Sequence, residues 1–140
     1  MKLAFVTVRY GATILGGAEQ ASRQLAEHLA ADGVDVEVHT TCAVDAVTWA
    51  DELRPGTTVE GGVTVHRHRS AGGRDPRFEA FSSTVLADPP HQPPAVQQRW
   101  LELQGPVCPD AVAAAADSGA DLVVCSCLLY TSDAADDLTR

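Results

Sequence analysis

The sequence predicts an α/β fold, an open parallel sheet with helices packed on its faces. Leu3–Val8 is an unbroken apolar run, which is typical of a strand buried on both sides inside a parallel sheet. A loop containing Gly16 and Gly17 follows, and a helical pattern begins directly after the two glycines. Val34–Thr40 then alternates apolar and polar residues and completes a strand–helix–strand unit. This order of elements is the opening of a Rossmann-like, doubly wound sheet.

The first helix is expected at Gly17–Ala31, and Gly33 is expected to end it as a C-cap glycine. In the strand that follows, Asp35, Glu37 and His39 alternate with valines, so we expect these polar residues on a more exposed face of the sheet. The helical stripe that should face the sheet consists of Ala18, Ala21, Leu25 and Leu29, bordered by the small residues Ser22 and Ala26.

The chain after Thr41 is expected to form smaller elements. Val47–Leu53 fits a short helix that carries Trp49, and we expect both Trp49 and Trp100 to be packing anchors. Two short extended stretches on either side of Gly61-Gly62 predict a β-hairpin. The remaining expected elements are strands at Thr57–Glu60, Val63–His68 and Asp121–Ser126, and helices at Pro76–Ala87, Ala95–Leu103 and Pro109–Ser118.

The glycine loop is the main candidate for a ligand site. Gly16 and Gly17 allow backbone N–H groups to approach a ligand, because no side chain blocks the way. The helix that follows presents unpaired N–H groups and a partial positive charge at its N-terminus. Together these features predict an anion site, most often one for phosphate, although the same loop is also compatible with a tight turn that holds no ligand.

Three neighbours of the loop are further candidates. Arg9 and Tyr10 follow the first strand at its carboxyl end, where open α/β sheets bind ligands, so we expect both to contact substrate or phosphate. A solvated surface arginine is the alternative for Arg9. Glu19 is expected to play a structural part, by bonding back to the loop and complementing the helix dipole.

Other glycine-loop chemistries do not fit the spacing. A dinucleotide fingerprint requires Gly-x-Gly-x-x-Gly, and Gly11 and Gly16-Gly17 do not follow it. Neither a Gly-Lys-Ser/Thr phosphate loop nor a Gly-x-Ser-x-Gly nucleophile elbow occurs in the sequence.

Metal chemistry has weak support in the sequence. His66 and His68 share one face of their strand, but no third ligand is evident, so we expect no metal site and read them as a polar strand end near the cleft. The cysteines form no Cys-x-x-Cys pair, which weighs against zinc held by cysteines.

The composition fits one domain with enough apolar residues for a core. The chain has 140 residues, 45% of them hydrophobic, and a formal charge of −9. An acidic chain of this kind is not expected to bind nucleic acid, which requires clustered Lys and Arg. The sequence contains no membrane-span pattern and no signal-peptide pattern, so we expect a cytoplasmic protein.

The segment 127–140 resembles a translated sequencing adapter. The transposon end used in library preparation translates in one frame as Cys-Leu-Leu-Tyr-Thr-Ser, and its usual continuation as Asp-Ala-Ala-Asp; these are the residues at 127–136. We therefore expect 127–140 to be non-native and 1–126 to be an incomplete N-terminal domain. Without the three Asp and one Arg of this tail, the 19 acidic and 10 basic residues fall to 16 and 9, and the charge to −7.

The motifs of residues 1–126 resemble the N-terminal domain of a family 4 type glycosyltransferase with the GT-B fold. The best element of the likeness is the loop Gly16-Gly17-Ala18-Glu19. The other matching stretches are Lys2–Thr7, Leu25–Ala30, Gly33–Val38, Val63–Arg67 and Asp121–Val124.

The resemblance implies a retaining, metal-independent hexosyltransferase of two Rossmann-like domains, with the active site between them. It implies a nucleotide-sugar donor, no further cofactor, and a sugar, lipid or polysaccharide acceptor; it also allows peripheral membrane association. Gly16 and Gly17 would approach the donor diphosphate, and Arg9 would contact acceptor or phosphate.

The family's C-terminal domain, with its Glu-x7-Glu signature, has no counterpart here. The resemblance therefore implies a fragment that is inactive alone and leaves its catalytic residues unknown. The alternative is a small Rossmann-like module that binds a nucleotide or phosphate without catalysis.

Overall fold

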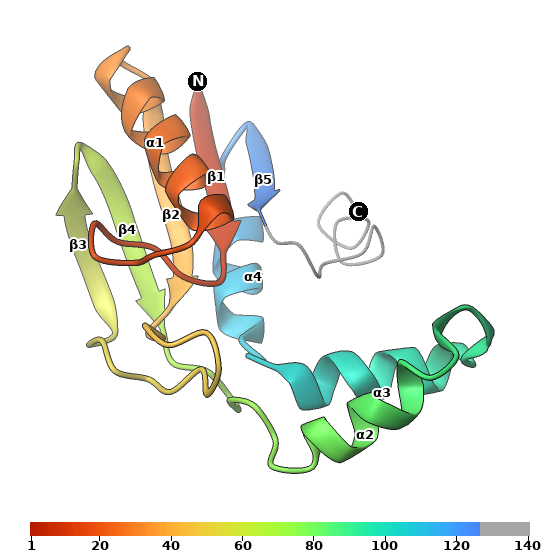
Figure 1. Cartoon of the computed structure of the whole chain (residues 1–140). Coiled ribbons are helices and arrows are strands. Elements are labelled where there is room, and N and C mark those ends of the chain that lie inside the picture. Colours follow the sequence, from red (N-terminus) through yellow and green to blue (C-terminus); the bar gives the residue numbers. More distant parts are fainter. Residues whose placement is uncertain (127–140) are drawn as a thin grey trace.

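The computed structural model describes residues 1–126 and shows an α/β fold built on a five-stranded mixed sheet (Figure 1). The suspected tail at 127–140 lies outside the described residues. The strand order is β3-β4-β2-β1-β5, and every neighbouring pair is parallel except the β3–β4 hairpin. The strands are β1 (Lys2–Thr7), β2 (Asp35–Thr41), β3 (Gly56–Glu60), β4 (Val63–His68) and β5 (Leu122–Ser126).

Helices lie on both faces of this sheet (Figure 1). The helix α1 (Gly17–Ala31) covers one face and α4 (Pro109–Ala116) covers the other. The strands that follow β1 in sequence, β2 and β4, are added on one side of it, and the last strand, β5, is added on the other side. The order in which strands are added therefore reverses at β1. The predicted Rossmann-like arrangement is therefore present in its coarse form, with a topological switch point beside β1.

The main core lies between the sheet and α1. Its centre combines Phe5 of β1 with Val38 of β2 and Val65 of β4, all 2% exposed or less. Ala26 of α1 is completely buried against these strands, because its small side chain allows the helix backbone to approach the sheet closely. Gly33 ends α1 as predicted, at φ 87, with Val34 N–H bonded to the Leu29 carbonyl at 3.0 Å.

The predicted contact stripe of α1 is confirmed at Leu29, which packs against the main core, and is wrong at Ala21 and Leu25, which are exposed. Leu25 is 51% exposed, whereas Ser22 and Ala26 are the buried residues of the helix. Ser22 bonds the Ala18 carbonyl and the Ser126 hydroxyl, so small residues rather than Leu25 face the sheet.

The predicted helix at Val47–Leu53 does not form. Asp45 instead accepts hydrogen bonds from the backbone N–H groups of Val47 and Thr48, which closes an Asx turn. Trp49 then adopts φ 57, in the left-handed region where a right-handed helix cannot continue. Its ring is nonetheless a buried packing anchor, as expected.

The remaining helices form an arm that extends away from the sheet (Figure 1). It consists of α2 (Phe78–Val85) and α3 (Pro94–Gln104), joined through a single 3-10 turn at Pro89–His91. The Phe78 and Trp100 rings pack 5.4 Å apart between the two helices, and Trp100 Nε1–H donates to the Ser82 hydroxyl at 3.0 Å. Among the described helices, none combines the length and the apolar character that crossing a bilayer requires.

The prediction that β2 has a more exposed polar face is wrong for two of its three residues. Glu37 is 8% exposed and His39 only 4%, while Asp35 at the strand start is exposed. The reason is that α4 packs over this face, against β2, β1 and β4.

Candidate functional site

The glycine loop lies at the carboxyl end of β1, at the topological switch point of the sheet. Gly16 adopts φ 152, and the first bond of α1 runs from Gln20 N–H to the Gly16 carbonyl at 3.0 Å. The N–H groups of Gly17, Ala18 and Glu19 therefore precede the helical bonding pattern. Apart from the adjoining backbone, no atom of the described residues lies within 4 Å of the position that a Gly17 side chain would take, so this point of the loop is open to an approaching group.

Arg9 fastens this loop to the body of the protein. Its Nε and one terminal nitrogen donate to the Glu19 carboxylate, the former at 3.0 Å. The other terminal nitrogen, Nη1, donates to the Val44 carbonyl at 2.9 Å. Nη2, the terminal nitrogen that binds Glu19, also donates to the Leu15 carbonyl. The arginine is buried and is therefore not the solvated side chain that the sequence left open as an alternative.

Glu19 is held in a structural position, but by a different partner from the expected one. Its carboxylate accepts from the Arg9 guanidinium and lies directly against the Gly16 backbone, so that any side chain at Gly16 would collide with it. The structure thus brings Arg9, Gly16 and Glu19 together, with a carboxylate near the positive end of the α1 dipole.

Tyr10 is separated from this group. Its side chain is 2% exposed and belongs to the main core, and its hydroxyl has no hydrogen-bond partner among the described residues. Burial, reinforced by the nearby Glu27 carboxylate, raises the pKa of Tyr10 to about 12. Arg67 donates to the Tyr10 carbonyl at 3.0 Å, so the backbone here is tied to β4.

We expect Tyr10→Phe to leave the protein at least as stable at pH 7, with a gain of up to about 1 kcal/mol, because the change removes an unpartnered buried hydroxyl. The raised pKa adds a second expectation. The folded protein keeps the proton of Tyr10 above pH 10, where the unfolded chain loses it, so wild-type stability falls from pH 10 to 12. Urea unfolding should show a shallower alkaline decline for the variant; an equal decline would contradict the assignment.

A small apolar recess lies at the same carboxyl edge, on the α4 side of the sheet. It is lined by the end of β1 and by α4 with the segment that leads into it. The lining residues are Val6, Thr7, Val8, Thr41, Pro106, Cys108, Ala111 and Val112. The glycine loop and this recess together place polar backbone groups and an apolar surface at one edge, as ligand sites of open sheets do.

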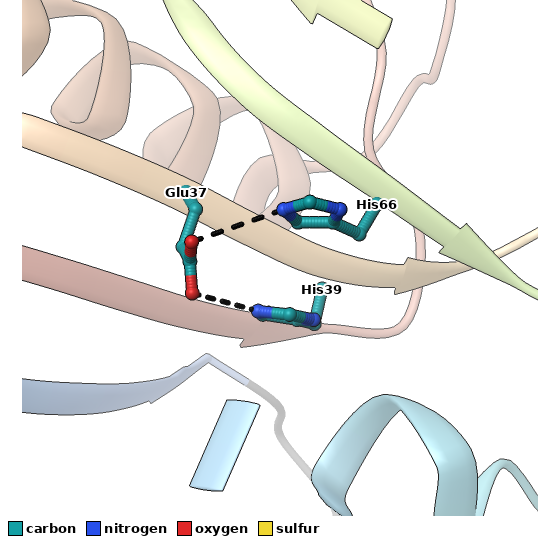
Figure 2. A group of neighbouring side chains, drawn as sticks. All are labelled: Glu37, His39 and His66. Carbon is teal, nitrogen blue, oxygen red and sulfur yellow. Dashed lines mark hydrogen bonds and ion pairs between the residues drawn. The ribbon is translucent and has the colours of Figure 1, made fainter. Parts of the chain in front are cut away.

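A second polar cluster, which sequence reasoning missed, lies on the α4 face of the sheet. Glu37 and His39 extend from β2 and His66 from β4, and the three side chains point toward one another (Figure 2). Their ligand-type atoms all lie within 4.8 Å of one another. The Nε2–H of His39 donates to Glu37 Oε1 at 3.0 Å, and Nε2 of His66 lies 3.8 Å from Glu37 Oε2.

Other groups hold this cluster from outside. Thr57 Oγ1 lies 2.9 Å from Nδ1 of His66, and Nε2 of His68 lies 3.4 Å from Nδ1 of His39. The ammonium group of Lys2 lies 3.0 Å from Glu37 Oε2. Each imidazole therefore directs Nε2 to the carboxylate, while its Nδ1 faces a separate partner.

The charge states in the cluster follow from its burial. Burial raises the pKa of Glu37, but hydrogen bonds from His39 and Lys2 outweigh this effect and hold the pKa below its usual value. Burial lowers the pKa of His39 below its usual value, against the opposing effect of Glu37. Burial also lowers the pKa of His68, and the neighbouring His39 and His66 add to this shift. These shifts favour neutral rings at His39 and His68 and a charged carboxylate at Glu37.

Comparison with protein-family models, with curated proteins and with solved structures gave no significant match. The fold and the two polar clusters are therefore interpreted from their own geometry, and the glycosyltransferase resemblance of the sequence stays a prediction.

Proposed function

We propose that the chain is the N-terminal part of a glycosyltransferase, and that its glycine loop receives the diphosphate of a nucleotide sugar. The observation that carries the proposal is the position of Gly16-Gly17. The loop joins β1 to the N-terminus of α1 at the switch point of the sheet, where open α/β folds place their ligands. Backbone N–H groups and the helix dipole are the groups that bind phosphate without a basic cluster.

The loop residues have different parts in this proposal. Gly17 is the open point at which a diphosphate oxygen reaches the backbone, since no side chain among residues 1–126 occupies the space beside its Cα. Arg9 is a positioning residue, because its guanidinium is already bonded to Glu19 and to loop and core carbonyls. As charge develops on the leaving diphosphate, the N–H groups stabilise it.

Gly17→Asp tests the loop directly. The Gly17 backbone is outside the left-handed region, and within the described part of the chain no side chain fills the space at this position, so the variant should fold. A carboxylate in the first helical turn also complements the helix dipole. The same charge should repel a diphosphate and weaken the binding of uridine diphosphate by at least ~10-fold. Isothermal titration of the full chain measures this effect.

Gln24→Glu is the matched control, because it adds the same charge to an exposed position farther along α1. Its affinity should equal that of the wild type. Equal affinities for wild type and Gly17→Asp would exclude the loop as the anion site.

A second experiment separates the transferase from a simple binding module. The gene should be read past codon 126 from independently prepared DNA. A continuation to a second α/β domain with a Glu-x7-Glu signature supports the transferase, whereas a stop codon shortly after Ser126 favours the nucleotide- or phosphate-binding module.

A further inference from the structure

We infer that Glu37, His39 and His66 form a binding site for one divalent metal ion of the zinc class. The site is separate from the glycine loop and independent of the proposed transferase. Two imidazoles and one carboxylate are a donor set that zinc accepts, with a fourth position left for water or another ligand. In this chain they converge from two adjacent parallel strands, because β2 and β4 pair His39 with His66.

The distances require only small movements. The ligand-type atoms lie within 4.8 Å of one another, and His39 Nε2 is already 3.0 Å from Glu37 Oε1. Ligands at about 2.1 Å from a tetrahedral zinc ion are separated by roughly 3.4 Å. The His66 ring has to approach most, and its side chain is the least buried of the three, at 28% exposed.

The outer contacts match the tautomer that a metal requires, which for His39 means moving the proton from Nε2, where it donates to Glu37 in the metal-free protein, to Nδ1. A metal-bound Nε2 leaves the proton on Nδ1, which then donates to a neighbouring acceptor. For His66 that acceptor is the Thr57 hydroxyl at 2.9 Å, and for His39 it is Nε2 of His68 at 3.4 Å. Both rings therefore have an Nδ1 partner in place, as metal-ligating histidines usually do.

Lys2 sets the limit on affinity. Its ammonium group lies 3.0 Å from Glu37 Oε2 and also donates to the Ser118 carbonyl at 2.7 Å, so a positive charge already sits on one side of the carboxylate. The metal would bind on the opposite side, through Oε1. Lys2→Met should therefore tighten metal binding, whereas in a purely structural cluster the same change only removes an ion pair.

The first test is a calorimetric titration of the full, chelator-treated chain with Zn²⁺. We expect one strongly bound ion per chain. His66→Gln should weaken its binding by more than ~100-fold, since the loss of an outer partner alone costs 10–100-fold. His91→Gln is the control, because His91 is an exposed histidine outside the cluster and should leave the affinity unchanged.

Thr57→Val gives a test that leaves all three ligands in place. Thr57 is exposed on β3, and valine suits a strand, so the variant should fold and lose affinity by about 10-fold. Thr58→Val is its matched control on the opposite face of the same strand and should not change the affinity. The proposal is overturned if the wild type binds no Zn²⁺, or if His66→Gln and Thr57→Val bind as the wild type does.

Discussion

Replacing Arg9 by alanine is expected to lower the free energy of unfolding by about 3–5 kcal/mol. The guanidinium is buried and joins three parts of the chain: the Glu19 carboxylate on α1, the Leu15 carbonyl in the glycine loop and the Val44 carbonyl after β2. Its removal leaves the Glu19 carboxylate, with 19% side-chain exposure, without its counter-charge. Urea unfolding followed by circular dichroism measures the loss.

Two further variants distinguish charge from geometry. Arg9→Lys keeps the charge but cannot form the forked contact, so we expect an intermediate loss. Glu19→Gln removes the charge and keeps a similar shape, and in a double-mutant cycle the pair should couple by more than 1 kcal/mol, above the usual value for surface pairs. A loss below ~1 kcal/mol for Arg9→Ala would show that the contact is solvent-screened.

Trp49→Ala is expected to lower the free energy of unfolding by a similar amount, about 3–5 kcal/mol. The indole is 9% exposed, and its Nε1–H donates to the Gln104 carbonyl at 3.0 Å, which ties the loop after β2 to the end of α3. The Arg9 and Arg74 guanidinium groups lie 5.8 and 5.9 Å from the indole ring centre. Removing the indole should therefore destabilise the fold and weaken the attachment of the α2–α3 arm to the sheet.

Hydrogen exchange resolves the second effect of Trp49→Ala. Amides near Gln104 should lose protection in the Trp49→Ala variant. Trp49→Phe keeps an aromatic ring, although a smaller one, and loses the donor, so its protection should fall between those of Trp49→Ala and the wild type. Loss of protection confined to the loop after β2 would contradict a role for Trp49 in holding the arm.

Local patterns were sufficient for most of the fold. The apolar run of β1, the glycines before α1 and the cap at Gly33 each depend on nearby residues, and these elements formed close to their expected bounds. The α1 stripe was misjudged because hydrophobicity favoured Leu25, while the sheet selects Ser22 and Ala26 for their small size. The helix expected at Val47–Leu53 does not form, because the Asx turn at Asp45 competes with it.

The polar cluster depended on information that no local pattern contains. Alternation in β2 identified Glu37 and His39 as sharing a face, but only the packing of α4 makes that face an interior one. His66 appeared to lack a third ligand because its partners are distant in sequence and meet it only through the β2–β4 register. The sequence signal that could have found the cluster is a Glu-x-His pattern in one predicted strand and a His-x-His pattern in a later one.

The position of β1 between β2 and β5 also has a consequence during synthesis. The Lys2 backbone N–H bonds the Asp121 carboxylate, a contact between residues 119 positions apart. At ribosomal speeds of 5–20 residues per second, roughly 6 to 24 s separate the appearance of these two residues. Throughout that interval one side of β1 has no strand to pair with, and such an open edge attracts other chains. The nascent polypeptide is therefore most vulnerable to misassociation before its own last described strand has been made.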